Sequence, residues 1–555
     1  MAVADRSLTK LESLKFEFGP DVAAEKQACL RALKSATLKN AEQVERLHET
    51  LCFMQAWPDD EDILTIVDEM LAHFSQRRDL AARKPELLNT GIAGTELAFR
   101  FYAATAQWLA AHWPGHVQID WEDFDNAEAF EPFLNLLACY CETPALETIA
   151  MELKDWIDRL RGPHETDASF VIKRLAAVIP NTFLHEHLYD KFDFPLILTP
   201  GDDVPSRTHA KYDQSPIQYQ VQPLNRSRPV VADEIARRHG ETQLVSRAEG
   251  RRLVDLARSA MLTRQRDLDA FAYADPRDVS VLHDDGLQFV LYGVLPERRF
   301  LLETLYGYLV LKNGVPISYG AVTCLFNSAE IAYTVFDTFR GGESTHVYVR
   351  TLAVMHQVFG CDTFMIDPYQ LGLDNDDALK SGAWWFYQKL GYRPRDKKRL
   401  QLMEQELKRM QRQPKHRSSL ATLKQLVTEN VYLSLDQQRD DVMGILELPN
   451  VGLHLTDLLA QRYGSDREQG ETELAKEAAQ KLRVKSFQGW SSNEKRAWHR
   501  WAPLVALIDD LDVWSRAEQE SLVHLIRHKG SRQEIAYLHA FDAHPRLRKA
   551  IVKLT

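Results

Sequence analysis

Residues 305–337 read LYGYLVLKNGVPISYGAVTCLFNSAEIAYTVFD, and this stretch decides the fold at the centre of the chain. Apolar and aromatic residues dominate runs at 305–311, 315–325 and 330–337, and a similar run occupies 287–294. The triplets Lys312-Asn313-Gly314 and Phe326-Asn327-Ser328 separate the runs. Because Asn-Gly between two such runs is a strong hairpin signal, the pattern predicts an antiparallel meander of three or four strands.

The segments around this meander predict the rest of a central α/β domain over residues 245–396. A helix is expected at about 249–268, before the strands, and another at about 344–359, after them. A short strand at 363–367, a helix at about 375–390 and a final extended piece follow. We therefore expect a mixed, largely antiparallel sheet with flanking helices.

The two flanks of this domain have a different pattern. Residues 1–180 carry apolar residues at helical spacing, for example from Thr95 to Ala110, and residues 397–555 do so as well. Both flanks are therefore predicted to be all-α domains. Residues 181–244 are rich in proline, which interrupts helices, and they are predicted to form an extended connector.

Composition excludes several classes of protein. The chain has 555 residues, of which 45% are hydrophobic, so it is neither mainly disordered nor collagen-like. Lys and Arg number 68 against 79 Asp and Glu, a formal net charge of −11, which argues against a wholly basic nucleic-acid binder. The N-terminus has no secretory signal pattern and no apolar stretch is long enough to span a bilayer. The sequence predicts a soluble, cytoplasmic protein without a transmembrane segment.

Cysteine and histidine patterns give no metal site. The six cysteines are sparse and form no CxxC pair, which is typical of reduced cytosolic thiols. His185-Glu186-His187 is the one cluster of metal-binding residue types, but the sequence fixes no third ligand for it. We therefore predict no bound metal.

Two segments carry a resemblance to a known family. The first is Ile331 to Thr345, IAYTVFDTFRGGEST, and the second is Ala383 to Tyr392, AWWFYQKLGY. The first looks like the fourth strand and pyrophosphate loop of the GNAT superfamily of CoA-dependent N-acyltransferases, and the second is similar to the closing helix of that fold. The resemblance covers roughly residues 245–396.

This resemblance implies an N-acyltransferase that moves an acyl group from acyl-CoA, most simply acetyl-CoA, directly to an amine on a small molecule, peptide or protein. A strand, a glycine turn and a helix in this order can hold a diphosphate, because backbone N–H groups converge at the helix N-terminus. The residues expected to bind CoA are Val335, Arg340, Gly341, Gly342, Glu343, Ser344 and Thr345.

The resemblance also implies catalytic roles. Tyr387 matches the tyrosine that protonates the departing CoA thiolate. Asp337 and Glu330 bracket the last strand of the meander, and either could take the proton from the amine, with Asp337 ranked first. Asp367 and Tyr369 follow the next strand and are the candidates for substrate contact.

Two alternatives remain open. Glu343 stands where the family loop usually has glycine, and Thr345 stands where it has glycine or alanine. Lys380 stands where the family often has asparagine. These departures favour a non-catalytic GNAT-like scaffold that binds a partner. Residues 393–417 contain ten Lys or Arg against three acids. They form either a solvated helix face or a site for an acidic or phosphate-bearing partner, and the second case favours an aminoacyl-transfer variant of the same fold.

Overall fold

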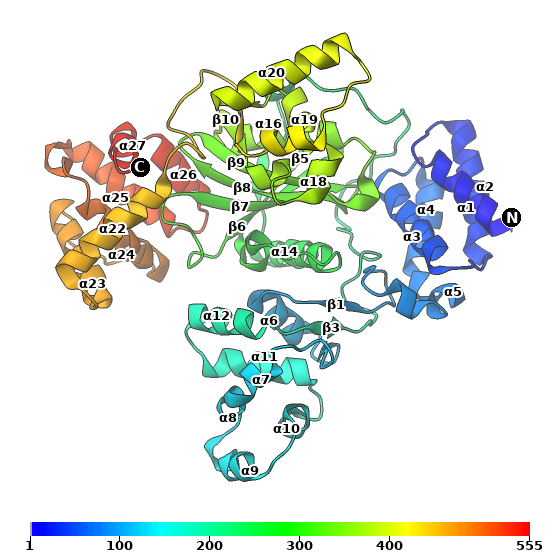
Figure 1. Cartoon of the computed structure of the whole chain (residues 1–555), viewed down its shortest axis with the longest axis horizontal. Coiled ribbons are helices and arrows are strands. Elements are labelled where there is room, and N and C mark those ends of the chain that lie inside the picture. The colour runs from blue at the N-terminus through cyan, green and yellow to red at the C-terminus, as the bar shows by residue number, and fades with distance from the viewer. Residues whose placement is uncertain (1–2) are drawn as a thin grey trace.

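The computed structural model describes residues 3–555 and shows a mixed α/β chain built around a nine-stranded sheet (Figure 1). The order of strands across the sheet is β11-β12-β10-β9-β8-β7-β6-β5-β4. Neighbours are antiparallel except β9 and β10, which are parallel. The strands are β4 (Thr242–Leu244), β5 (Ala274–Asp284), β6 (Leu287–Val294), β7 (Thr304–Lys312), β8 (Val315–Leu325), β9 (Ser328–Val335), β10 (Thr363–Ile366), β11 (Arg393–Pro394) and β12 (Val431–Ser434).

The predicted meander is confirmed as β6 to β9. Its tight turns use left-handed backbone where the sequence supplies Asn and Gly: φ is 51° at Asn313, 80° at Gly314 and 57° at Asn327. The parallel neighbour β10 is reached through the helix α16 (Ser344–Phe359), as a parallel connection requires.

Helices cover both faces of the sheet (Figure 1). α14 (Arg247–Leu262) and α15 (Asp269–Ala272) lie on one face, and α16 and α19 (Ala383–Lys389) lie on the other. Two consecutive residues of β7 show this division. A Cβ atom at Gly307 would meet Ala270 and Phe271 of α15, whereas the ring of Tyr306 lies 5.1 Å from that of Phe359 at the end of α16. Successive side chains of a strand point to opposite faces.

The prediction that residues 1–180 are all helical is wrong. α1 (Val3–Leu14), α2 (Pro20–Ser35), α3 (Ala41–Ala56) and α4 (Glu61–Ala72) do form a helical core. After them, β1 (Leu97–Phe99) and β2 (Val117–Ile119) pair with β3 (Leu196–Leu198), and a helix expected to include Leu97 begins only with α6 (Ala103–His112). The partner strand lies about 100 residues away in sequence, so local periodicity gave no sign of it.

The expected connector is also more ordered than predicted. It contains α12 (Thr182–Phe192), β3, α13 (Val231–Ala236) and β4. The first proline after α12 is Pro195, so the chain there is free to form a helix.

The C-terminal boundary expected at residue 396 cuts the central sheet. α20 (Lys397–Arg412) and α21 (Leu420–Leu426) are followed by β12, which inserts between β10 and β11. Only from residue 448 onward is the chain helical throughout, with α22 (Leu448–Tyr463), α23 (Arg467–Lys481), α24 (Ser492–Ala506), α25 (Arg516–Lys529), α26 (Ile535–Asp542) and α27 (Pro545–Val552), apart from one short 3-10 turn. Among residues 3–555, no helix combines the length and apolar character needed to cross a membrane.

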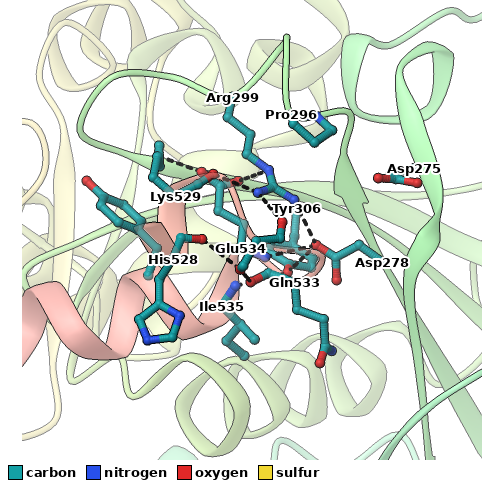
Figure 2. A network of polar contacts seen from close by, with 12 residues as sticks. Asp275, Asp278, Pro296, Arg299, Tyr306, His528, Lys529, Gln533, Glu534 and Ile535 are labelled. Carbon is teal, nitrogen blue, oxygen red and sulfur yellow. Dashed lines mark hydrogen bonds and ion pairs between the residues drawn. The ribbon is translucent and has the colours of Figure 1, made fainter. Parts of the chain in front are cut away.

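A buried network of charges joins these last helices to the sheet (Figure 2). Arg299 lies 3.8 Å from Asp278 and 3.7 Å from Glu534, and Lys529 lies 2.5 Å from Glu534. The hydroxyl of Tyr306 donates to Asp278 at 2.8 Å. Two cations therefore meet two anions, and none of the four side chains is more than 5% exposed. Since buried charges are tolerated only when paired, this network fixes the C-terminal helices against the sheet.

Candidate functional site

The candidate site lies where β9 and β10 separate. β9 pairs with β8 along its whole length, as far as Val335 opposite Ser318, but it pairs with β10 only from Ser328 to Glu330. From Ile331 onward, one edge of β9 has no neighbouring strand. Such an edge presents backbone N–H and C=O groups that can bind another strand or a ligand. We call the space beside residues 331–335 the strand gap.

A side chain of the protein itself fills the strand gap. Gln370, on the short helix α17 (Pro368–Leu371), donates from Nε2 to the carbonyl oxygen of Ile331 at 3.1 Å. Its Oε1 accepts from the backbone N–H of Tyr333 at 3.2 Å. Nε2 also donates to Oδ2 of Asp367 at 3.0 Å, which holds the amide from behind. A carboxamide has the donor and acceptor of a peptide group, so Gln370 pairs with β9 as a neighbouring strand would.

The glycine loop, residues 340–345, leads from β9 into α16. Gly341 has a φ of +88°, a left-handed conformation that glycine adopts without strain. Ser344 and Thr345 occupy the first turn of α16. Backbone N–H groups in a first helical turn have no partner within the helix, so the loop has the donors that an anion needs.

Aromatic side chains that follow α1 and α3 lie against the glycines of the loop. A Cβ atom at Gly342 would lie 3.6 Å from the ring of Trp57, and one at Gly341 would lie 3.6 Å from the ring of Phe16. The space left between Trp57 and the start of α16 is about 10 Å³, room for a single water molecule. Trp57 therefore fills the space beside the first turn of α16, whereas Arg340 and Gly341 of the loop are exposed.

Glu343 places a negative charge at the same point. It is the N-cap residue of α16, and its carboxylate accepts from Nε1 of Trp57 at 3.4 Å and from the backbone N–H of Asn225 at 2.9 Å. The helix dipole favours a carboxylate there. Because like charges repel, Glu343 opposes the binding of a second anion at the loop.

Tyr387 lies in a buried aromatic cluster beneath the strand gap. It is 4% exposed, and its ring lies 5.6 Å from those of Tyr348 and Tyr392. Burial, followed by the negative charge of Asp367, raises the pKa of the Tyr387 phenol. The hydroxyl is therefore protonated at neutral pH, as a proton donor must be.

Glu330 and Asp367 lie near one another at the closed end of the gap. Glu330 is opposite Met365 in the last residue pair of β9 and β10, and Asp367 directly follows β10. Burial, and then the charge of Asp367, raises the pKa of Glu330. Glu330 is thus a carboxyl group whose proton affinity has been increased, which suits a general base.

Asp337 is separate from these groups. Glu330 and Val335 are five residues apart, about 17 Å along a strand, and Asp337 lies further still. Asp337 is exposed and forms an ion pair with Arg340 at 2.8 Å. The structure therefore does not bring the two predicted bases together. Tyr369, the second predicted substrate contact, is 60% exposed, and its backbone N–H donates to Asp367.

Sequence reasoning identified neither Trp57 nor Gln370. Trp57 is 286 residues from Glu343, so no local pattern could connect it with the glycine loop. Gln370 lies three residues after Asp367, and a single glutamine carries no signal in composition or spacing.

The basic segment 393–417 and the cluster His185-Glu186-His187 lie on elements other than those of the strand gap, around α20 and on α12. Most of the basic side chains of 393–417 are exposed on and around α20, at the top of Figure 1. His185 and Glu186 lie on α12, where Glu186 forms an ion pair with Arg298. In the described part of the chain, no group of three or more His, Cys, Asp or Glu side chains is arranged to hold a metal ion.

Comparison of the chain with protein-family models, with curated proteins and with solved structures gives no match.

Proposed function

We propose that the central unit is an N-acyltransferase of the GNAT type, which moves an acyl group from acyl-CoA, acetyl-CoA first, to an amine. One observation carries this proposal: a parallel strand pair that separates after Glu330 and is followed by a glycine loop and a helix N-terminus. In that arrangement a pantetheine arm can pair with the free edge of β9 while its diphosphate meets the first turn of α16.

The residues present fit acyl-CoA chemically, but Gln370 holds the strand edge that the pantetheine arm would pair with, and the pocket beside Trp57 measures about 10 Å³, so both side chains would move when the ligand binds. The bound thioester supplies the activated acyl group. Glu330 takes a proton from the attacking amine, directly or through water, and Tyr387 donates one to the departing sulfur. The N–H of Tyr333, which now donates to Gln370, becomes available to hold a carbonyl oxygen.

A second function, a non-catalytic scaffold, is favoured by a specific observation. Trp57, Glu343 and Gln370 together occupy the ring, charge and hydrogen-bond positions that a CoA molecule would need. If these contacts are permanent, the central unit serves only to hold the helical flanks. The two proposals differ in whether any acyl-CoA binds.

Titration calorimetry of the full chain with CoA, acetyl-CoA and a long-chain acyl-CoA tests the proposal. Arg340→Glu reverses a charge that is 65% exposed beside the loop, so it should leave the fold intact and weaken binding at least tenfold. Lys476→Glu, an exposed charge reversal on α23, is the control and should leave binding unchanged. No heat with any thioester would support the scaffold instead.

A further inference from the structure

A second cavity lies at the far end of β9, beside the predicted base Asp337. Its volume is about 160 Å³, more than ten times the space that one water requires. Segments far apart in sequence enclose it: α3, residues 89–90, the connector, the turn after α14, the first half of β8 and the end of β9. Its lining includes Arg207, Arg264, Arg266, Tyr319, Thr334 and Asp337. We call it the arginine cavity.

One of its three arginines has a carboxylate partner. Nη2 of Arg207 lies 2.6 Å from Oε1 of Glu49, and the Arg207 side chain is 12% exposed. Burial alone would raise the pKa of Glu49, but its contact with His48 and the charge of Arg207 hold it at about 2. Glu49 is therefore ionised at neutral pH, and its charge is committed to Arg207.

Arg264 has no such partner. Its guanidinium stacks on the ring of Phe336, 3.9 Å from the centroid, and Nη1 donates to the carbonyl oxygen of Ala260 at 2.8 Å. Within residues 3–555 no carboxylate lies within 4 Å of it, and its buried Nε has no hydrogen-bond partner. Burial, with the charge of Arg207, lowers the pKa of Arg264 to about 9, so the group still carries its charge at pH 7.

The rest of the lining compensates this charge only in part. Arg266 also has no carboxylate within 4 Å among the described residues, whereas Asp337 is paired with Arg340 outside the cavity. Glu45 is the one further acidic side chain of the lining. The hydroxyl groups of Tyr319 and Thr334 add neutral donors.

The buried network of Figure 2 shows how the same chain handles a buried arginine that has a structural role. There Arg299 meets Asp278 and Glu534, and the adjoining space is only about 10 Å³. In the arginine cavity, by contrast, guanidinium groups outnumber the carboxylates available to them and there is open space beside them.

We propose that the arginine cavity is a binding site for a small oxyanion, the carboxylate or phosphate group of a small molecule. A guanidinium offers planar, paired N–H donors that match either group, and Arg264 and Arg266 would supply them. Tyr319 and Thr334 would complete the hydrogen bonds. This site does not depend on acyl transfer, because Tyr319 and Thr334 point to the face of the sheet opposite Ser318 and Tyr333, which line the pocket beside the glycine loop.

Titration calorimetry of the full chain with inorganic phosphate and with malonate tests the site and distinguishes the two kinds of oxyanion. We expect one of them to bind with a 1:1 stoichiometry. Arg266→Gln, which changes an exposed side chain and should not disturb the fold, is expected to weaken that binding at least tenfold. Arg264→Gln should weaken it further. Arg238→Gln, an 89% exposed arginine before the remote edge strand β4, is the control and should bind as the wild type does.

Two results would overturn the proposal. One is the absence of binding of either anion by the folded wild type at millimolar concentration. The other is binding that Arg266→Gln leaves unchanged, since the anion would then lie elsewhere. Neither result bears on acyl-CoA binding, which Arg340→Glu tests at the other side of β9.

Discussion

Two pockets beside the C-terminal end of β9 differ in a way that separates a filled site from an open one. Toward the glycine loop, Trp57 and Glu343 line a pocket of only about 10 Å³, and Gln370 holds the free edge of β9. In the arginine cavity, about 160 Å³ is lined by three arginines, and among the described residues only Arg207 of the three has a carboxylate within 4 Å. Contacts within the chain therefore fill the pocket on one face of β9, whereas the pocket on the other face is open. Substitutions in the two pockets test this difference.

The largest effect is expected from removing Trp57. Its side chain is 2% exposed and stacks on Phe53, with 4.8 Å between ring centroids. Trp57→Ala should lower the free energy of unfolding by about 3–5 kcal/mol, because a large buried side chain leaves a cavity. Trp57→Phe keeps a ring and should cost clearly less. Denaturant titration of both variants measures this, and a loss below about 1 kcal/mol for Trp57→Ala would show that the ring does not hold the loop closed.

The second prediction contrasts two buried arginines. Arg299→Gln should cost about 3–5 kcal/mol, because it leaves Asp278 buried without a cation and Glu534 with Lys529 alone. Arg264→Gln, in a buffer free of phosphate and carboxylates, should cost no more than about 1 kcal/mol, since it removes one hydrogen bond but also relieves repulsion from Arg207. Equal losses in the same denaturation assay would mean that Arg264 is also part of a balanced structural network.

Acid should affect the two charged regions in opposite directions. The pKa of Glu49 is about 2 in the folded state against 4.5 ordinarily, so its stabilising contribution is present above pH 4.5 and is lost as pH falls toward 2. Burial, against the hydrogen bond from Tyr306, raises the pKa of Asp278 to about 6, so its contribution is present below pH 4 and is lost as pH rises through 6.

Stability against pH for Glu49→Gln and Asp278→Asn checks these signs. The difference in free energy of unfolding between the wild type and Glu49→Gln should become smaller as pH falls below 4.5. The wild type should lose stability relative to Asp278→Asn between pH 4 and 6. If the difference in free energy of unfolding between the wild type and either variant stays constant with pH, the assigned ionisation of that residue is wrong.

The smallest effect is expected at Gln370. Gln370→Ala removes two hydrogen bonds to β9, at a partly exposed position, and should cost about 1 kcal/mol. Gln370→Glu can still accept from Tyr333 but cannot donate to Ile331 when ionised, so it should also be destabilised. Amide hydrogen exchange at Tyr333 should become faster in both variants, and unchanged exchange would show that Gln370 does not protect the strand edge.

The sequence predicted the part of the fold that depends on neighbouring residues. The meander follows from alternating apolar runs and an Asn-Gly turn, and the helix after the glycine loop follows from its apolar periodicity. The strands β1 and β12 were missed because their partners lie about 40 to 100 residues away and their own patterns are three or four residues long.

The candidate site also has a part that neighbouring residues predict and a part that depends on distant contacts. Glycines and tyrosine in a local motif pointed to the loop and to Tyr387, and the end of a predicted strand pointed to Asp367. Nothing local connects Trp57 with Glu343, or Arg207 with Arg264, because these contacts depend on how distant segments pack. The ranking of Asp337 above Glu330 rested on strand position alone, without knowledge that Arg340 pairs with Asp337.

Calorimetric titration of acetyl-CoA into the wild type and into Trp57→Leu, which keeps an apolar side chain, tests the central proposal most directly. If a CoA site exists and Trp57 closes it, opening the loop raises the binding-competent fraction, and the variant should bind at least tenfold more tightly than the wild type. Absence of binding by both proteins, with the variant shown to be folded, would contradict the acyltransferase proposal and leave the central unit as a scaffold.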